Sequence, residues 1–322
     1  MPLITDSDNT PAAQAISVVI VNHNGGSYLT RAVQSVVEEV ASVIVVDNHS
    51  TDESLSELEQ TVTASTLMVL RQTKNLGFGQ GCNLGFAKTN SPYVLFLNPD
   101  CIMQPGALTA LHHTLSQHSQ AGVVGPLIVH PNGQEQVGAR RDLPTPLQFL
   151  SLGLGLARFF PNRPQLRNYN HAGRPLPGQA EPVQALSGAC FLIRRSAFEA
   201  VHGFDEAFFF NFEDLDLCLR LGNAGISILF EPSAQVVHVR GVCRRTRPFL
   251  TTYHTYRSCI GYFNRHFPHP SQWGWRLMLV GLLLMHSLLF LPKPLYMKLR
   301  YGWRGNAVLS EKSMPISSDR QP

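Results

Sequence analysis

The chain has 322 residues, of which 44% are hydrophobic and only 15% are charged, and its formal net charge is +4. This composition predicts a globular protein with a sizeable core and excludes a largely disordered chain. The mild positive charge indicates anionic partners without implying nucleic acid. The six cysteines form no C-x-x-C pair, so we expect free thiols in a reducing, cytoplasmic compartment rather than a zinc or disulfide framework.

The first hundred residues alternate between β-branched runs and segments with helical spacing of apolar residues. Residues 1–15 are polar, without the apolar core of a secretory signal, and are expected to be a loose tail. Buried strands are predicted at 16–21 and 43–46, and further strands at 67–70 and 93–97. Helices are predicted at 28–40 and 54–63 and after the glycine-rich residues 75–85. This alternation predicts an α/β fold with a mostly parallel central sheet flanked by helices.

Polar clusters follow three of these strands, at Asn22, at Asp47 and at the triplet 98–100. In parallel α/β sheets, ligands bind beyond the carboxyl ends of the strands, so these clusters predict a shared site. Each cluster alone is equally well explained by an ordinary turn or helix cap. Pro99 stiffens the last cluster, which suits Asp100 to hold Mg²⁺ or Mn²⁺ against a diphosphate.

The glycine-rich residues 75–85 permit a close approach of backbone to a ligand, although a flexible turn before a helix is the alternative. They do not match G-x-G-x-x-G, because Cys82 stands at the third glycine position. A nicotinamide-dependent oxidoreductase is therefore disfavoured. From 126 to 182 the chain is rich in Pro, Gly, Arg and Asn, and we expect an irregular insertion there.

The most unusual stretch runs from Phe208 to Leu221, where four aromatics precede Glu213, Asp214 and Asp216. Helical spacing places the acids in a first turn, where the helix dipole favours carboxylates. Capping does not explain the aromatics, whereas a partly desolvated general base does. His238, after a predicted strand at 234–237, is either a metal ligand or a packed imidazole. The basic loop with Arg244 and Arg245 suits a diphosphate, although a solvated charged face is the alternative.

Taken together, these motifs resemble the family 2 glycosyltransferases with a GT-A fold, in particular their bacterial rhamnosyltransferase-like branch. The matching segments keep one order over residues 16–240. They are 17–24, 45–52, 75–79 with Asn83, 96–100, 188–190, 203–206, 213–216 and His238. One departure concerns the D-x-D motif of the family, whose first acid is Asn98 here, so that Asp100 must carry more of the metal binding.

The resemblance implies a hexosyltransferase that uses a nucleoside-diphosphate sugar, with deoxythymidine-diphosphate rhamnose favoured and a UDP-sugar as the alternative. Transfer with inversion would reach a hydroxyl of a growing polysaccharide or lipid-linked glycan, as in cell-wall assembly. The implied donor contacts are Asn22, Asp47, Asn75, Gly77, Gly79, Asn98, Asp100, Arg244 and Arg245. The implied metal ligands, for Mg²⁺ or Mn²⁺, are Asp100 and His238. Asp214 would be the base with Glu213 beside it, and Gly188, Ala189 and Cys190 would shape the acceptor side.

The expected organisation is a tail at 1–15, a GT-A catalytic domain at 16–243, a helical extension at 244–308 and a disordered tail at 309–322. Within the extension, residues 277–291 are apolar but too short to span a bilayer. Aromatic and basic residues within 273–304 flank this run. They fit a helix in the interface of an anionic membrane, which would place the protein on the inner face of the cell membrane. A helix packed on the catalytic domain or in an oligomer is the equal alternative.

A catalytically idle nucleotide-sugar-binding protein at the membrane surface is the main competing function. The acids at 213–216 argue against it, since binding alone does not require them. A nucleic-acid binder is disfavoured because the basic residues are mostly confined to 240–247 and 293–304 instead of forming a face with interleaved aromatics.

Overall fold

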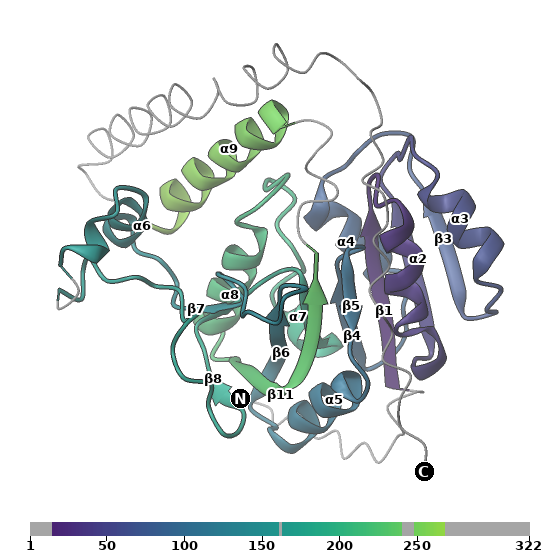
Figure 1. Ribbon diagram of the computed structural model, residues 1–322, viewed down its shortest axis with the longest axis horizontal. Coiled ribbons are helices and arrows are strands. Elements are labelled where there is room, and N and C mark those ends of the chain that lie inside the picture. Colours follow the sequence, from purple (N-terminus) through teal and green to yellow (C-terminus); the bar gives the residue numbers. More distant parts are fainter. Residues whose placement is uncertain (1–14, 161–162, 240–247, 268–322) are drawn as a thin grey trace. The chain divides into compact units, whose positions relative to one another are not determined.

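The computed structural model describes residues 15–160, 163–239 and 248–267 (Figure 1). The chain divides into two units, Met1–His269 and Pro270–Pro322, and all described residues belong to the first. The predictions for Arg244, Arg245 and the segment 273–304 therefore lie outside the described residues. Within the described part, no helix is both long and apolar enough to cross a membrane.

Nine strands form the central sheet, in the order β3-β2-β1-β4-β10-β6-β11-β5 with β8 paired to β11. The strands of this sheet are β1 Ile16–Asn22, β2 Ser42–Asp47, β3 Leu67–Arg71, β4 Tyr93–Leu97, β5 Cys101–Met103, β6 Ala121–Val129, β8 Glu181–Pro182, β10 Cys190–Arg194 and β11 Ser227–His238. The pairs among β1 to β4 and the β6–β11 pair are parallel, whereas β10, β5 and β8 run antiparallel to their neighbours. A separate ribbon pairs β7 Arg140–Arg141 with β9 Ala185–Leu186. The prediction of a mostly parallel sheet is confirmed.

Helices cover both faces of the sheet. The helices are α2 Ser27–Gln34, α3 Ser54–Thr61, α4 Phe78–Phe86, α5 Ala107–Gln117, α6 Pro146–Gly153, α7 Arg195–Ala200, α8 Glu213–Asn223 and α9 Pro248–His266, with 3-10 turns η1 Val37–Glu39 and η2 Leu156–Arg158. Buried apolar side chains of α2, α3 and α5 pack on one face, where alternate β1 residues such as Val18 and Ile20 point. On the other face α4 contacts β1, and phenylalanines of β4, β10 and α7 pack together. Because the central strands are buried on both faces, the sheet has an apolar core on each side.

Two predicted helices have different bounds in the structure. The helix expected at 28–40 ends at Gln34, since the Ser35 hydroxyl donates to the Ala32 carbonyl (2.7 Å) and accepts from the Met103 amide (3.2 Å). The glycine-rich stretch is itself helix α4 rather than a turn before it. A Cβ at Gly81 or Gly85 would lie within 2.8 Å of a β1 valine side chain, so these glycines permit close helix–sheet packing.

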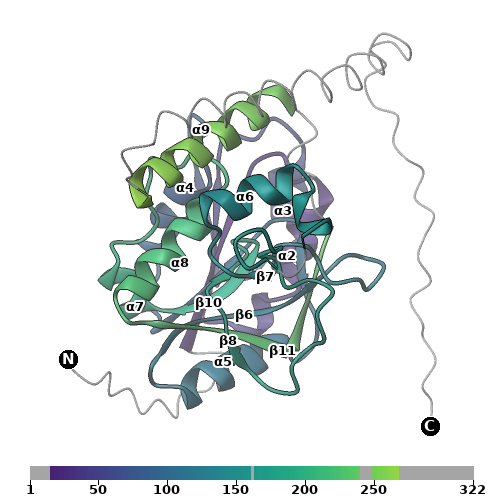
Figure 2. The ribbon, with the colours of Figure 1, turned by 90° about the vertical axis from the view of Figure 1, so that its left-hand side faces the viewer.

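The prediction of an irregular insertion at 126–182 is wrong in part. It contains the end of β6, β7, helix α6 and the turn η2. Helix α6 begins with a capping box, in which Thr145 and Gln148 bond each other's backbone amides, and Pro146 takes the first helical position. Helices α6 and α9 lie side by side, as two views show (Figures 1 and 2), and Phe149 meets Phe263 with ring centroids 5.4 Å apart.

Candidate active site

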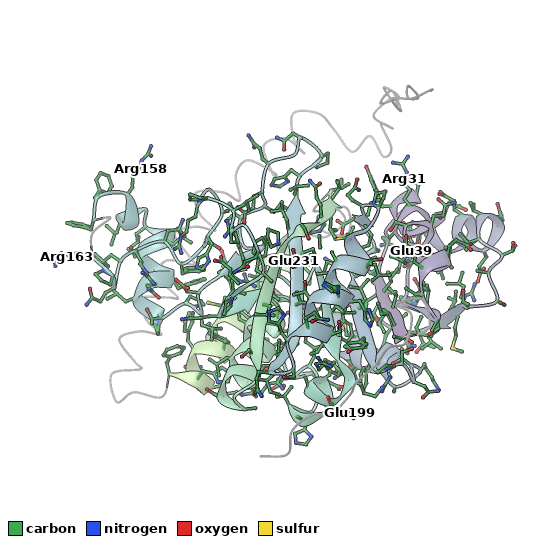
Figure 3. All side chains as sticks on the ribbon, turned by 90° about the horizontal axis from the view of Figure 1, so that it is seen from below. Arg31, Glu39, Arg158, Arg163, Glu199 and Glu231 are labelled. Carbon is green, nitrogen blue, oxygen red and sulfur yellow. The ribbon has the colours of Figure 1, made fainter. Side chains whose placement is uncertain are left out.

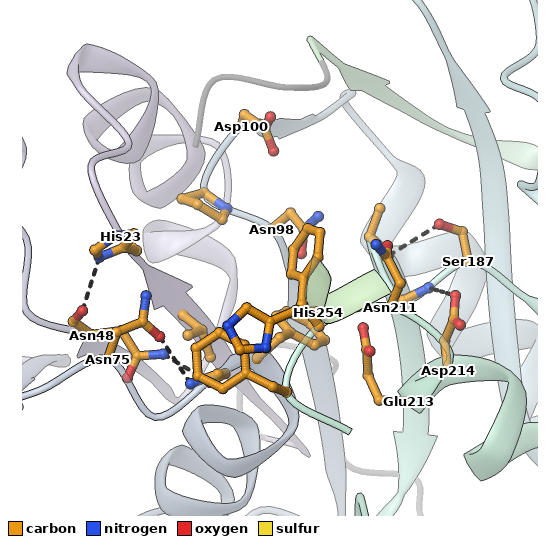
Figure 4. Close-up of a pocket in the computed structure, with 18 of the residues that line it drawn as sticks. His23, Asn48, Asn75, Asn98, Asp100, Ser187, Asn211, Glu213, Asp214 and His254 are labelled. Carbon is orange, nitrogen blue, oxygen red and sulfur yellow. Dashed lines mark hydrogen bonds between the residues drawn. The ribbon is translucent and has the colours of Figure 1, made fainter. Parts of the chain in front are cut away.

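A cavity of about 650 Å³ opens beyond the carboxyl ends of β1, β2, β4 and β11. Its lining includes most residues singled out from the sequence. These are Asn75, Gly77, Asn98, Asp100, Gly188, Ala189, Glu213, Asp214 and His238. Figure 4 shows His23, Asn48 and Asn75 on one side of the cavity, Glu213 and Asp214 on the other, and Asp100 away from both groups. The strand-end clusters thus meet in one place, as the topology predicts.

Of the predicted site residues that the structure describes, four do not line the cavity. Asn22 and Asp47 are buried behind its wall, where the Asn22 amide donates to Asp47 Oδ1 at 3.0 Å. Asp47 also accepts from the amide (3.1 Å) and the hydroxyl (2.5 Å) of Ser50, so its carboxylate orders the turn after β2. Gly79 packs against Phe204, and Cys190 is buried beside Met103. These residues do not face the cavity and pack behind the residues that line it.

Asp100 and His238 form a candidate metal site. Gln136 Nε2 donates to the His238 carbonyl (2.7 Å), which directs Gln136 Oε1 at His238 Nδ1 (2.9 Å). Nδ1 therefore carries the proton, and a neutral imidazole then presents a lone pair on Nε2. Nε2 lies 3.1 Å from Asp100 Oδ1, so two acceptors face each other unless a cation or a second proton lies between them. The pair fits a divalent cation, with Gln136 orienting the imidazole from outside.

Cys101 lies in the same cluster, with its ligand atom within 4.8 Å of those of Asp100 and His238. Its thiol donates to the Ala189 carbonyl at 3.4 Å. Burial, reinforced by the Asp100 charge, raises the pKa of this thiol well above its ordinary value. Because a neutral thiol is a poor ligand for a hard cation, only Asp100 and His238 suit Mg²⁺ or Mn²⁺ here.

Glu213 and Asp214 open helix α8 and have different surroundings. Asp214 Oδ2 accepts from the Gly188 amide (3.0 Å) and pairs with the Arg141 guanidinium, and Oδ1 accepts from the Leu215 amide (2.8 Å). Burial alone would lower the pKa of Arg141, but the Asp214 carboxylate, together with Cys218 and Tyr169, outweighs burial and raises that pKa. Both side chains are 16% exposed at the cavity. The ion pair and the two amide hydrogen bonds hold the Asp214 carboxylate in place at the cavity.

Glu213 is the more buried acid of the two, with 7% of the residue exposed. Burial, followed by the charge of Asp214, raises the pKa of Glu213 from 4.5 to about 8. Its Oε2 is buried and has no hydrogen-bond partner among the described residues. Near neutral pH, Glu213 is therefore protonated and can donate a hydrogen bond. Asp214 is then the acid of the pair that suits the role of base.

The backbone before the two acids is strained. Asn211 and Phe212 have φ of 61° and 70°, which is rare for a bulky residue such as phenylalanine. The Phe212 ring is held by Phe149 of α6 and by Tyr262 and Phe263 of α9. Strain of this kind persists where surrounding packing enforces it, and it marks functional sites.

Helix α9 also brings a residue into the cavity. His254 stacks on Phe209 with ring centroids 4.1 Å apart and an interplanar angle of 27°, and both residues line the cavity (Figure 4). His254 Nδ1 has no hydrogen-bond partner in the described part of the chain. Burial, with the nearby Arg257 charge, lowers the pKa of His254, so the ring is neutral near pH 7. The stack is a flat apolar platform that carries a ring nitrogen able to bond a ligand.

Asp216, the third acid of the cluster, serves a different purpose. It is fully buried, and its two oxygens accept from His266 Nε2 and Arg220 Nε, both at 2.7 Å. Since His266 ends α9, this carboxylate fastens α9 to α8. The spacing of the three acids in the sequence does not distinguish the docking acid from the pair that lines the cavity.

Sequence reasoning missed Arg141, Gln136 and His254. Arg141 and Gln136 lie in the segment expected to be irregular, and His254 lies beyond the expected catalytic domain. Neither a motif nor hydrophobic periodicity marks them. Only the long-range pairing of β7 with β9 and the docking of α9 bring them to the cavity.

Solved structures with the same architecture identify the fold. The chain superposes on GalNAc-T7 with UDP, GalNAc and Mn²⁺ with a TM-score of 0.53 and 20% identity, over 70% of this chain and 43% of that one. It superposes on the mannosyltransferase PcManGT of Pyrobaculum calidifontis, in complex with GDP-Man and Mn²⁺, with a TM-score of 0.50 and 13% identity, over 95% of this chain and 80% of that one. These likenesses show the GT-A fold of glycosyltransferases, as expected.

Sequence comparison identifies the family. Residues 17–201 match the profile of glycosyl transferase family 2. The chain is 34% identical over 237 residues to N-acetylglucosaminyl-diphospho-decaprenol L-rhamnosyltransferase of Mycobacterium tuberculosis, covering 69% of this chain and 75% of that protein. It is 26% identical to rhamnosyltransferase WbbL of Escherichia coli, covering 69% and 83%. The chain belongs to glycosyl transferase family 2 and is a glycosyltransferase that takes its sugar from a nucleotide sugar.

Proposed function

We propose that the chain is an inverting, metal-dependent transferase that moves rhamnose from a nucleoside-diphosphate sugar to a hydroxyl of a lipid-linked or growing polysaccharide glycan. The observation that carries the proposal is one cavity lined by both the Asp100–His238 pair and the Glu213–Asp214 pair. Two of the relatives are named as rhamnosyltransferases, which supports rhamnose, and the name of one of them supports a lipid-diphosphate-linked acceptor. Deoxythymidine-diphosphate rhamnose is the favoured donor, and a UDP-sugar is the alternative.

The donor would bind across the strand ends. Backbone and amide groups around Asn48, Asn75 and Gly77 suit the nucleoside, and Asn98 with Asp100 suits the diphosphate. Gly77 has φ of 88°, and a Cβ there would lie 2.5 Å from the Phe209 carbonyl, so this wall needs glycine. Asp100 and His238 would hold Mg²⁺ or Mn²⁺, which stabilises the negative charge of the departing diphosphate when it is bound.

The acceptor would bind on the α8 side, against the Phe209–His254 platform, with Gly188 and Ala189 at its edge. Asp214 removes the acceptor hydroxyl proton while that oxygen attacks the anomeric carbon from the face opposite the diphosphate. The bond from the anomeric carbon to the diphosphate oxygen breaks, and the nucleoside diphosphate leaves with the bonding electrons. Arg141 holds Asp214 in position, and the neutral Glu213 is placed to donate a hydrogen bond to substrate.

The Asp214→Asn variant tests this assignment. The amide keeps the side-chain shape but cannot accept the proton, so we expect sugar transfer to fall by about a hundredfold or more. Donor affinity, measured by calorimetry, should change by less than about threefold. A control variant, Asp142→Asn, alters a carboxylate that does not line the cavity and should retain activity. Wild-type turnover in Asp214→Asn would show that another group is the base.

A membrane-associated location follows from a lipid-linked acceptor. The enzyme would then work on the inner face of the cell membrane, in the compartment where its buried thiols stay reduced.

A further inference from the structure

One part of the surface combines exposed apolar side chains with positive charge, at the segment from α6 through η2. Phe159 is 73% exposed, and Phe160, Leu154 and Leu147 are each 44–45% exposed. They are four of the nine large apolar side chains that stand exposed among the described residues. Such clustering marks an interaction surface, because scattered single apolar residues are the norm elsewhere.

The same segment is anchored firmly on its inner side. Leu150 is 3% exposed, the Ser151 hydroxyl donates to the Leu166 carbonyl at 2.7 Å, and Phe149 packs on Phe212 and Phe263. The exposed rings therefore belong to a folded element whose inner face is already packed. Their outer face is the one that a partner could cover.

The charge of this surface indicates which partner. No Asp or Glu occurs from 143 to 180, whereas Arg158, Arg163, Arg167 and Arg174 all do. Arg158 and Arg163 pair with no carboxylate in the described part of the chain, and Arg163 lies over the Phe160 ring at 5.9 Å. Figure 3 shows Arg158 and Arg163 together at one end of the view, with Arg31 and Glu39 at the opposite end.

We propose that residues 147–160, together with Arg163, dock on an anionic lipid bilayer. Phe159, Phe160, Leu147 and Leu154 would enter the interface, and the two arginines Arg158 and Arg163 would contact lipid phosphates. Aromatic and aliphatic side chains flanked by arginine are what an interfacial, non-spanning contact requires. The apolar side chains supply the buried area, and the absence of acids over 143–180 removes repulsion from anionic headgroups.

This contact would serve the proposed function without depending on it. Phe149 on the inner face of α6 touches Phe212, which immediately precedes Glu213 and Asp214. A bilayer on the outer face would bring a lipid-linked acceptor close to the acid pair. Vesicle binding itself involves neither donor nor transfer, so it can fail while the transferase assignment stands, and the reverse also holds.

Co-sedimentation of the full chain with phosphatidylglycerol-rich vesicles tests the proposal. The Phe159→Ser/Phe160→Ser variant should bind at least about tenfold more weakly, because two rings no longer leave water. The affinity of the Arg158→Gln/Arg163→Gln variant for these vesicles should fall about fivefold for each charge removed, and the variant should no longer prefer phosphatidylglycerol over phosphatidylcholine. The matched controls are Met68→Ser, 46% exposed on β3, and Arg31→Gln on α2, which should bind like the wild type.

Hydrogen exchange locates the contact independently of the variants. Vesicles should slow exchange in peptides covering 147–160, and the unfolding midpoints of all variants should stay within a few degrees of the wild type. The proposal is overturned if the wild type does not bind these vesicles. It is equally overturned if the double phenylalanine variant binds like the wild type, or if protection falls only on 268–322, a segment that would then be the membrane contact.

Discussion

At the scale of single residues, the two adjacent acids of the site have different surroundings. Asp214 is charged and held by Arg141 and the Gly188 amide, whereas Glu213 is buried with an oxygen that has no hydrogen-bond partner among the described residues. Burial, followed by the charge of Asp214, raises the pKa of Glu213 to about 8, whereas the Asp214 carboxylate is paired directly with Arg141. This difference is the main reason to assign proton removal to Asp214.

The raised pKa of Glu213 makes stability depend on pH in a definite direction. With a pKa near 8 in the fold and 4.5 as its ordinary value, Glu213 keeps in the folded protein a proton that the unfolded chain has lost. The fold therefore loses stability as pH rises from about 4.5 to about 8, at up to about 1.4 kcal/mol per pH unit. A glutamine side chain does not titrate, so Glu213→Gln should become progressively more stable than the wild type across this window.

Thermal unfolding of both proteins between pH 4.5 and 9 measures the effect. The advantage of Glu213→Gln should grow up to about pH 8 and stay level above it. Glu39→Gln, which changes an exposed glutamate on η1, should give a curve parallel to that of the wild type. Parallel curves for Glu213→Gln as well would mean that Glu213 is ionised in the fold at neutral pH.

At the scale of elements, the α8 side of the cavity depends on helix α9. This helix is fastened by the buried Asp216–His266 pair, by the Asn211–Thr255 bond of 2.7 Å and by the rings of Tyr262 and Phe263 around Phe212. In turn it supplies His254 to the cavity. Helix α9 therefore supports both the strained turn before Glu213 and Asp214 and the Phe209–His254 platform beside them.

Asp216→Asn should loosen this support. The amide cannot balance the charge of Arg220 and has a single acceptor oxygen in place of the two that bond Arg220 and His266, so we expect a loss of about 3 kcal/mol in the free energy of unfolding. Denaturant unfolding measures it. Glu59→Gln makes the same chemical change in the exposed Arg71–Glu59 pair and should cost about 0–1 kcal/mol. Equal effects of the two substitutions would contradict a docking role for Asp216.

The sequence could predict elements where a local pattern is decisive. The buried strands β1, β2 and β4 and the partly exposed strand β3 follow from continuous apolar runs, and helix α8 follows from its acidic first turn and leucine spacing. Helix α4 could not be located from the sequence, because glycines usually indicate a turn. Here they allow the helix to pack closely on Val19 and Val21 of β1. Helix α6 was missed because its capping box lies among prolines and glycines, which suggest irregular structure.

At the scale of the whole molecule, the site joins segments that are far apart in the sequence. Asp100, Asp214 and His238 could be predicted because each stands in a recognisable order of motifs at a strand or helix end. Arg141, Gln136 and His254 could not, since their positions depend on pairing between distant strands and on the docking of α9. Contacts between distant segments leave no pattern in the local sequence, although they decide which groups line the cavity.

In the proposed function, the cavity binds a nucleoside diphosphate together with a divalent metal at Asp100 and His238. The most direct measurement is the unfolding midpoint with dTDP, UDP or GDP, each with Mn²⁺ and with chelator. At about a hundredfold excess over its Kd, one nucleotide with Mn²⁺ should raise the wild-type midpoint by roughly 5 °C or more. Chelator and Asp100→Ala should each remove most of that shift, whereas Glu39→Ala should keep it. A midpoint unmoved by every nucleotide with Mn²⁺, or a full shift in Asp100→Ala, would contradict the claim.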